Sequence, residues 1–341
     1  MEKTMLAAVF EGQGKLMLKD VPVPKIEKPD QVLLEVEAAG ICGTDLHILD
    51  VPPGHPATPG SILGHEYVGR VLEIGSGVQS LKPGDRVVVA PNLYCGICGP
   101  CSSGRPNQCE HFTTLGIFLN GGFAKYNVAP ESALFKISPT LPAGEAVYVE
   151  LLSCIVGGTE KVRLQPGETV AILGAGPVGL MFELVFKAAG AGKIIMTDIA
   201  PYRLDYAKKL GADVVVNVKD QDPVAVTREV TGGKGVDVVV DAVGSLFPQA
   251  LEQAAVGGKI VLFGMNSQAM GQVHQFDITR KELTVMGTYI GIHTFPKAIR
   301  MLESGAVKPS ALTTHDLPLA KIHDGIAALR AGKGIKAVIT P

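Results

Sequence analysis

Four cysteines stand close together in a segment rich in glycine and proline. Cys95, Cys98, Cys101 and Cys109 follow the spacing C-x2-C-x2-C-x7-C. Four thiolates from one loop fill the tetrahedral shell of Zn²⁺ and leave no open position, so the pattern predicts a structural zinc site. An iron–sulfur cluster is an alternative, but the ferredoxin run has three residues before its last cysteine and a proline after it. Here seven residues precede Cys109 and Glu110 follows it. Four free surface thiols are the remaining alternative.

A second set of metal-binding side chains lies outside that loop. Cys42 occurs in the segment GICGTDLH (40–47), and His65 and Glu66 occur in Gly64-His65-Glu66. A catalytic zinc site needs three protein ligands and one labile position, and the third ligand here is either Glu66 or Glu150. Taken singly, Cys42 reads as a core residue, His65 as a loop histidine and Glu66 as a surface charge. Without the other motifs of the chain, these ordinary interpretations would prevail over a catalytic zinc.

A glycine-rich turn predicts a dinucleotide site. The segment 174–179 fits G-x-G-x-x-G, follows the strand TVAIL and opens an apolar helix, and its members are Gly174, Ala175, Gly176, Pro177, Val178 and Gly179. Such a turn brings pyrophosphate to a helix N-terminus, where free N–H groups and the helix dipole favour anions. Asp198 ends the next strand at the spacing expected for a ribose-binding carboxylate, which favours NAD because it repels a 2′-phosphate. Arg203 is close enough to weaken that preference, and a purely structural glycine turn is the alternative.

The elements that position these residues change in kind along the chain. Up to about residue 150, short β-branched runs such as VLLEVEAAG and DRVVVA are separated by turn signals, which indicates an antiparallel barrel or sandwich. From about Pro166, apolar strands such as KIIMTD and VDVVVDAVG alternate with helix-length segments, which indicates a parallel sheet covered on both faces. Helical stretches over 295–303 and 320–331 and a final strand, KAVITP, follow.

Composition narrows the class of protein. The chain has 341 residues, a formal net charge of −2, 46% hydrophobic and 5% aromatic residues, with 41 glycines and 23 prolines. A hydrophobic chain of this length predicts two folded domains, and its charge balance offers no basic excess for nucleic acid. The first ten residues, MEKTMLAAVF, lack the apolar stretch of a secretion signal, and no segment is long and apolar enough to span a membrane. We therefore expect a cytoplasmic protein whose six cysteines are reduced.

The motifs in their order resemble the zinc-dependent medium-chain dehydrogenases, the zinc alcohol dehydrogenase family. GICGTDLH, GHEYVGRVLEIGSGV, the four-cysteine loop and GAGPVG carry the resemblance over essentially the whole chain. It implies a GroES-like β-barrel catalytic domain formed by residues 1–152 and 290–341. It also implies a doubly wound Rossmann NAD-binding domain, 153–289, inserted between them, with the active site in the cleft.

The resemblance also implies roles for individual residues. Cys42, His65, Glu66 and Glu150 would bind the catalytic zinc, with one glutamate exchangeable, and Asp45 would orient a ligand. Thr44 would hydrogen-bond the substrate oxygen, and His47 would relay its proton through the cofactor ribose. The nicotinamide would lie against four further residues: Val243, Phe263, Met265 and Thr288. Cys154 would pack against the cofactor.

The substrate is predicted from the departure at Glu150. Alcohol dehydrogenases of the family have cysteine there, whereas glutamate is typical of the polyol and threonine branches. We expect reversible oxidation of a secondary alcohol to a ketone by NAD, on a polyol, a sugar alcohol or its phosphate. L-threonine and vicinal diols are the alternatives, followed by a simple alcohol. A non-catalytic NAD-binding protein or a zinc-free reductase would have lost these motifs. The family resemblance implies two zinc ions per chain and a homotetramer or homodimer.

Overall fold

The computed structural model describes residues 3–341, which fall into two compact units. A split unit comprises Met1–Ser153 and Ile292–Pro341, and an inserted unit comprises Cys154–Gly291. The boundaries predicted after residues 152 and 289 lie one and two residues before the observed ones. Residues 1 and 2, part of the first predicted segment, lie outside the described residues.

The split unit is built on a seven-stranded sheet in the order β16-β17-β3-β4-β5-β9, with β8 also paired to β3. Its strands are β3 (Gln31–Ile41), β4 (Glu66–Ile74), β5 (Arg86–Val89), β8 (Tyr126–Pro130), β9 (Leu134–Lys136), β16 (Thr313–Pro318) and β17 (Lys336–Thr340). Two further two-stranded antiparallel sheets accompany it: β1 (Thr4–Gly12) with β2 (Lys15–Pro22), and β6 (Asn92–Leu93) with β7 (Thr113–Thr114).

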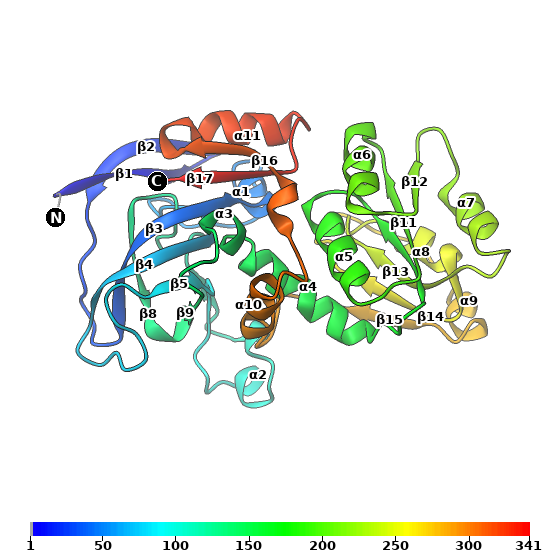
Figure 1. Cartoon of the computed structure of the whole chain (residues 1–341), viewed down its shortest axis with the longest axis horizontal. Coiled ribbons are helices and arrows are strands. Elements are labelled where there is room, and N and C mark those ends of the chain that lie inside the picture. Colours follow the sequence, from blue (N-terminus) through cyan, green and yellow to red (C-terminus); the bar gives the residue numbers. More distant parts are fainter. Residues whose placement is uncertain (1–2) are drawn as a thin grey trace. The chain divides into compact units, whose positions relative to one another are not determined.

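Most strand pairs of this sheet are antiparallel, as predicted. The exception is β16–β17, which is parallel because helix α11 (Ile322–Arg330) connects the two strands as a crossover. Strand β17 then pairs antiparallel with β3, so residues 337–339 lie beside residues 39–41, red beside blue in Figure 1.

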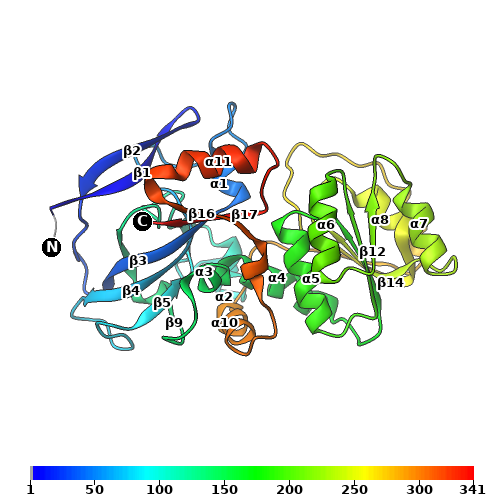
Figure 2. The same cartoon turned by 45° about the horizontal axis from the view of Figure 1, so that its top comes forward.

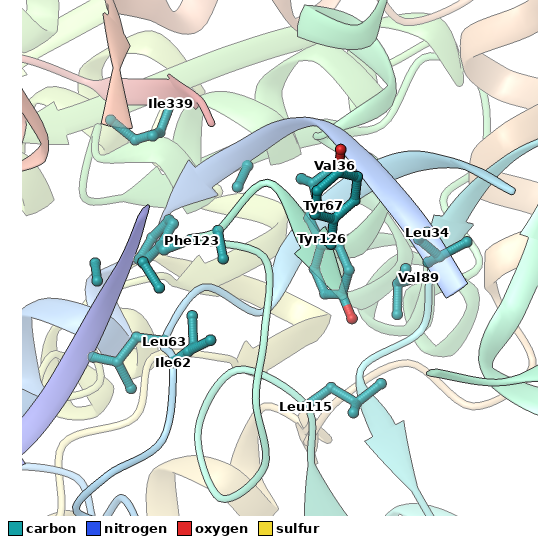
Figure 3. Packing of buried hydrophobic residues seen from close by; sticks show 14 of the residues in the cluster. Leu34, Val36, Ile62, Leu63, Tyr67, Val89, Leu115, Phe123, Tyr126 and Ile339 are labelled. Atoms are coloured by element: carbon teal, nitrogen blue, oxygen red, sulfur yellow. The ribbon is translucent and has the colours of Figure 1, made fainter. Parts of the chain in front are cut away.

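An apolar core stabilises the split unit. Figure 3 shows side chains from β3, β4, β17 and the loop before β8 gathered in it, among them Leu34, Tyr67, Ile339 and Phe123. Gly64 has a positive φ of 91°, and a Cβ there would lie 2.6 Å from the Phe123 ring, so glycine is required directly before His65. The core thus fixes the entry into β4.

The inserted unit is a six-stranded sheet in the order β12-β11-β10-β13-β14-β15. All its pairs are parallel. The strands are β10 (Thr169–Leu173), β11 (Lys193–Asp198), β12 (Val214–Asn217), β13 (Val236–Asp241), β14 (Ala254–Leu262) and β15 (Thr284–Gly287). The order reverses between β10 and β13, which is where doubly wound sheets bind ligands. The predicted fold class is confirmed for this unit.

Helices complete both units. In the inserted unit, α5 (Pro177–Ala188) contacts α6 (Pro201–Leu210), and α7 (Pro223–Val230) contacts α8 (Phe247–Gln253). Figure 2 shows the two helix pairs on opposite faces of the sheet. The other helices are α1 (Gly43–Ile48), α2 (Gly99–Ser102), α3 (Ala143–Ala146), α4 (Val149–Val162), α9 (Gln275–Arg280) and α10 (Phe295–Glu303), with 3-10 turns at Pro106–Gln108, Glu131–Ala133, Pro309–Leu312 and Leu319–Lys321. Across residues 3–341, no helix has the length and apolar character needed to cross a membrane.

Candidate functional site

The four cysteines of the predicted structural site converge. The Sγ atoms of Cys95, Cys98, Cys101 and Cys109 all lie within 4.8 Å of one another. Backbone N–H groups point at the sulfurs: that of Cys98 donates to Cys95 Sγ at 3.4 Å, and those of Cys95 and His111 donate to Cys109 Sγ at 3.3 Å. Such bonds favour thiolates, and the N–H groups of Ile97 and Cys98 lower the pKa of Cys95 to about 6. Burial, in contrast, raises the pKa of Cys101 to about 12, so that thiol would have to lose its proton when a metal binds.

The second group is assembled by strand ends of the split unit. Cys42 directly follows β3, His65 directly precedes β4, and Glu66 is the first residue of β4, which runs antiparallel to β3. The end of β3 and the start of β4 therefore share one edge, and ligand atoms of Cys42, His65 and Glu66 lie within 4.8 Å of one another. His65 and Glu66 are buried and Cys42 is partly buried.

Asp45 supports this group from helix α1. Its Oδ2 accepts the Cys42 N–H at 2.8 Å, and its Oδ1 lies 3.6 Å from His65 Nδ1. Burial opposes a charged imidazole, but the Cys42 thiolate and the Asp45 carboxylate outweigh it and hold the pKa of His65 well above its ordinary value. Without a cation, a proton on His65 thus offsets part of the local negative charge.

A lysine absent from the predicted site completes the charge balance. Lys336, at the start of β17, is 2% exposed, and its Nζ binds Glu66 Oε2. Burial opposes the ammonium charge, but Glu66 and Cys42 outweigh it and hold the pKa of Lys336 above its ordinary value. Gly40 makes the contact possible, because on the intervening strand β3 it is paired with Val338 and Glu66. A Cβ at Gly40 would lie 2.4 Å from Glu66 Oε2 and 3.1 Å from Lys336 Cε.

The donor set fits a divalent cation. Buried Glu66 Oε1, His65 Nδ1 and Asp45 Oδ1 have no hydrogen-bond partner, although such atoms ordinarily have one. As ionised groups, Cys42, Glu66 and Asp45 carry three negative charges against the one positive charge of Lys336. One Zn²⁺ would balance that excess, and sulfur, imidazole and carboxylate are its usual ligands. The grouping includes no Glu150 carboxylate oxygen among the described residues, and Glu150 lies in the first turn of α4.

Helix α1 carries both residues of the predicted proton relay. Thr44 and His47 are three positions apart and so lie on one face of the helix. Thr44 Oγ1 lies 3.8 Å from Cys42 Sγ, next to the metal-binding group, whereas the His47 ring is exposed to solvent. This face of the helix therefore extends from the ligand group to solvent.

The glycine turn of the inserted unit lies between β10 and α5, as predicted. Gly174 has a φ of 102°, and a Cβ at Gly179 would lie 1.8 Å from the Gly174 carbonyl oxygen, so both positions require glycine. A Cβ at Gly176 would meet only Arg203 Nη1, at 3.8 Å, so that side of the turn is open. Pro177 and Val178 begin helix α5, whose N-terminus is a suitable anion site.

Asp198 and Arg203 flank that turn. Asp198, the last residue of β11, accepts the Ala175 N–H at 2.8 Å with Oδ2 and the Ala200 N–H at 2.9 Å with Oδ1. A carboxylate has about four acceptor positions, so further donors such as ribose hydroxyls can be accommodated. Arg203 Nη1 lies 3.8 Å from Asp198 Oδ2, so a cation accompanies the carboxylate.

The residues predicted to face the nicotinamide follow the carboxyl ends of β13, β14 and β15. Val243 is partly exposed, and its Cγ2 lies 2.7 Å from a Cβ built on Gly174, so it borders the glycine turn. Met265 is exposed, whereas Thr288 is buried and its N–H donates to the Leu262 carbonyl. Phe263 packs edge-on against Phe182 of α5 at 4.9 Å between ring centroids, which gives it a packing contact that the sequence did not predict.

Family models of known proteins match a segment in each of the two units of the chain. The family model of the alcohol dehydrogenase GroES-like domain matches residues 28–139, and that of the zinc-binding dehydrogenases matches residues 177–304. The chain is 36% identical to a sorbitol dehydrogenase of Bacillus subtilis, over 95% of this chain and 93% of the relative. It is 35% identical to an L-threonine 3-dehydrogenase of Bacillus velezensis, over 95% of each chain.

Two solved structures share the whole fold. A zinc-binding dehydrogenase target from Sinorhizobium meliloti 1021 bound to NADP has a TM-score of 0.94 and 32% identity, with 100% of both chains covered. The 2R,3R-butanediol dehydrogenase from Bacillus subtilis has a TM-score of 0.90 and 31% identity, with 99% of both chains covered. The chain therefore belongs to the zinc-dependent medium-chain dehydrogenase family, with a GroES-like domain, a Rossmann domain and the chemistry of a nicotinamide-dependent alcohol dehydrogenase.

Proposed function

We propose that the chain oxidises a secondary alcohol of the polyol class to the ketone, reversibly, with NAD⁺ as hydride acceptor. The group of Cys42, His65 and Glu66 carries the proposal, because three donors of different type meet beside unpartnered buried oxygen and nitrogen atoms. These residues would hold the catalytic zinc, with Glu150 as a further candidate ligand. Bound there, Zn²⁺ acts as a Lewis acid that lowers the pKa of a hydroxyl.

We propose roles in ligand exchange, proton transfer and cofactor binding for other residues of the chain. Glu66 is shared with Lys336, so we propose that Glu66 is the ligand that exchanges and that Lys336 receives it when it leaves. Thr44 would accept a hydrogen bond from the substrate hydroxyl, and His47, exposed on the same face of α1, would pass the proton to solvent. In the inserted unit, the open side of Gly176 and the N-terminus of α5 would hold the pyrophosphate, and Asp198 the adenosine ribose.

The substrate class rests on the relatives and on the carboxylate in the donor set. The relatives described above act by their names on sorbitol, L-threonine and butanediol, all hydroxyl compounds with a second polar group nearby. We propose a polyol, a sugar alcohol or its phosphate first, and L-threonine or a vicinal diol as the alternative. A screen of NAD⁺ reduction over these classes and simple alcohols tests this. The highest kcat/KM on a simple primary alcohol would refute the substrate class.

The metal content has its own test. We propose two zinc ions per chain, one in the four-cysteine loop and one with Cys42, His65 and Glu66. Metal analysis of protein purified without chelators should find both, and Cys42→Ser should lose one zinc and all turnover while keeping its circular dichroism spectrum. Retained turnover in Cys42→Ser would remove Cys42 from the ligand set, and one zinc or none in the unmodified protein would contradict the two-site proposal.

We propose NAD⁺ rather than NADP⁺ because the Asp198 carboxylate would repel a 2′-phosphate. Arg203 lies beside it and would offset part of that repulsion. The expected ratio of kcat/KM for NAD⁺ over NADP⁺ is at least about tenfold. Equal use of the two cofactors would contradict the role of Asp198, and Asp198→Asn should narrow the ratio.

We propose that the chain assembles into a homotetramer or homodimer through the inserted unit. Strand β15 is an edge strand, and exposed apolar residues Met270, Val273 and Phe276 precede it in sequence. Light scattering at micromolar concentration should give a multiple of the chain mass; a monomer would exclude this assembly.

We propose that the chain works in the cytoplasm, because a cluster of four cysteine thiols stays reduced in a reducing compartment.

A further inference from the structure

The exposed histidine of helix α1 belongs to a three-residue network in the split unit. His47 Nδ1 lies 3.4 Å from Asp50 Oδ2, and Arg330 Nη2 donates to Asp50 Oδ1 at 3.0 Å. We propose that Asp50 and Arg330 are positioning residues, which fix the tautomer and the orientation of His47 for proton transfer. This inference rests on the proposed function, since it concerns how the reaction proton leaves.

The local backbone already limits where the His47 ring can lie. The His47 carbonyl accepts N–H groups from Asp50 at 3.3 Å and from Gly54 at 2.9 Å, so the chain folds back beneath the end of α1. A Cβ at Gly54 would lie 3.3 Å from His47 Cβ and 3.5 Å from Nδ1. Because Gly54 has no side chain, the imidazole ring of His47 has room to lie where its Nδ1 contacts Asp50.

The Asp50 carboxylate determines which ring nitrogen carries the proton. An ionised carboxylate only accepts hydrogen bonds, so Nδ1 of neutral His47 must be the donor. Nε2 then carries the lone pair and is the nitrogen that can take a proton, as in other histidines oriented by a carboxylate. When Nε2 accepts the proton, the imidazolium lies beside a negative charge, and the exposed ring can release the proton to water.

Arg330 explains why the carboxylate holds this orientation. It occupies Asp50 Oδ1 while His47 occupies Oδ2, so each oxygen has its own partner. The same Nη2 also donates to the Leu46 carbonyl at 3.2 Å, one residue before His47. The last residue of α11 therefore joins the C-terminal segment to both sides of the relay histidine.

Exposed ion pairs contribute little to stability, so the expected effect of this network is on proton transfer rather than on folding. The charged and titratable groups around His47 are Asp50 on the following loop, Arg330 of α11, His55 further along the loop, and Asp45 two residues earlier on α1. Of these, Asp50 makes the ring contact. Asp50→Asn keeps the shape of the side chain but offers an amide, which can donate or accept a hydrogen bond. The variant therefore no longer requires the His47 proton to be on Nδ1.

Two measurements on the zinc-loaded chain test the proposal. Long-range ¹H–¹⁵N spectra of the histidine rings, with the His47 signals assigned from His47→Gln, should show the proton on Nδ1 in the unmodified protein. In Asp50→Asn the proton should move towards Nε2. For alcohol oxidation, Asp50→Asn should lower kcat about tenfold with KM for alcohol and NAD⁺ changed less than about twofold. Arg330→Gln should lower kcat about threefold, and Asp50→Glu should recover most of the loss.

The matched control is Asp324→Asn, an exposed carboxylate on the same helix as Arg330 that should change neither measurement. An unchanged tautomer in Asp50→Asn would overturn the proposal, and so would a changed tautomer with unchanged kcat. The spectrum requires no substrate. A chain that oxidises none of the screened alcohols would therefore refute the proposed function and the relay role with it, while the spectrum still decides whether Asp50 orients His47.

Discussion

Replacing Lys336 by methionine should destabilise the split unit far more than loss of a surface lysine. The substitution keeps an apolar stem of similar length but leaves the Glu66 carboxylate buried without its counter-charge. Removing one member of a buried ion pair costs about 3–5 kcal/mol. For a domain of about 200 residues this corresponds to a fall in melting temperature of about 6–20 °C.

The metal should change this cost. Zn²⁺ bound to Glu66 would supply the missing positive charge, so the loss in Lys336→Met should be larger in chelator-treated protein than in zinc-loaded protein. Glu66→Gln/Lys336→Met has neither charge and should recover part of the stability, and the double-mutant cycle measures the coupling. Urea unfolding followed by circular dichroism, with hydrogen exchange of the β17 amides, measures the loss of stability with and without zinc and the coupling energy between Glu66 and Lys336.

Lys333→Met is the matched control, because Lys333 is exposed and should change the free energy of unfolding by no more than about 0.5 kcal/mol. Two results would refute the reasoning. One is a loss in Lys336→Met as small as that of the control. The other is a double variant no more stable than Lys336→Met, which would show that Glu66 is not the group left uncompensated.

Three further outcomes are expected. Burial raises the pKa of Glu183 to about 8, so the folded state holds a proton that the unfolded state has lost above its ordinary pKa of 4.5. Stability should therefore fall by about 3–5 kcal/mol as the pH rises from about 4.5 to 8. Glu183→Gln should remove that slope in urea unfolding at pH 5, 7 and 9, and parallel curves would contradict the assignment. Gly64→Ala should cost at least about 2 kcal/mol, because a side chain there combines a positive φ with a clash against Phe123, and thermal unfolding checks it. Cys109→Ser should lose one zinc by metal analysis and lower the melting temperature while the second zinc stays bound; two zincs retained would remove Cys109 from the four-cysteine site.

Local spacing predicted the parts of the site that a single segment or strand pair positions. The four cysteines share one loop, and Cys42 and His65 flank an antiparallel strand pair, so their meeting follows from short-range structure. The glycine turn and Asp198 follow from the strand–helix alternation of a doubly wound sheet. The family and the fold class were accordingly predicted from the sequence and are confirmed.

Lys336 was not predicted because nothing in the strand KAVIT distinguishes a buried lysine from a surface one. Its position depends on β17 pairing with β3 across a separation of almost the whole chain, and on the missing side chain of Gly40. The Asp50–Arg330 contact was missed for the same reason. The two residues are 280 positions apart, and the pairing of β17 with β3 brings α11 close to α1. Glu150 lies on helix α4, and no strand pairing among the described residues connects that helix to the other ligands, so its role stays a prediction.

The position of β17 also has a consequence for how the protein is made. Strand β17 is synthesised after β1 to β16, yet it lies inside its sheet between β16 and β3. The inserted unit is complete in sequence well before that moment and is free to fold first during synthesis. Until β17 docks, residues 39–41 of β3 lack the strand that pairs with them beyond β8, and Glu66 has no counter-ion. A nascent chain in which β17 has not yet formed would thus carry a folded nucleotide domain and an incompletely paired β3, the kind of species that chaperones and proteases recognise.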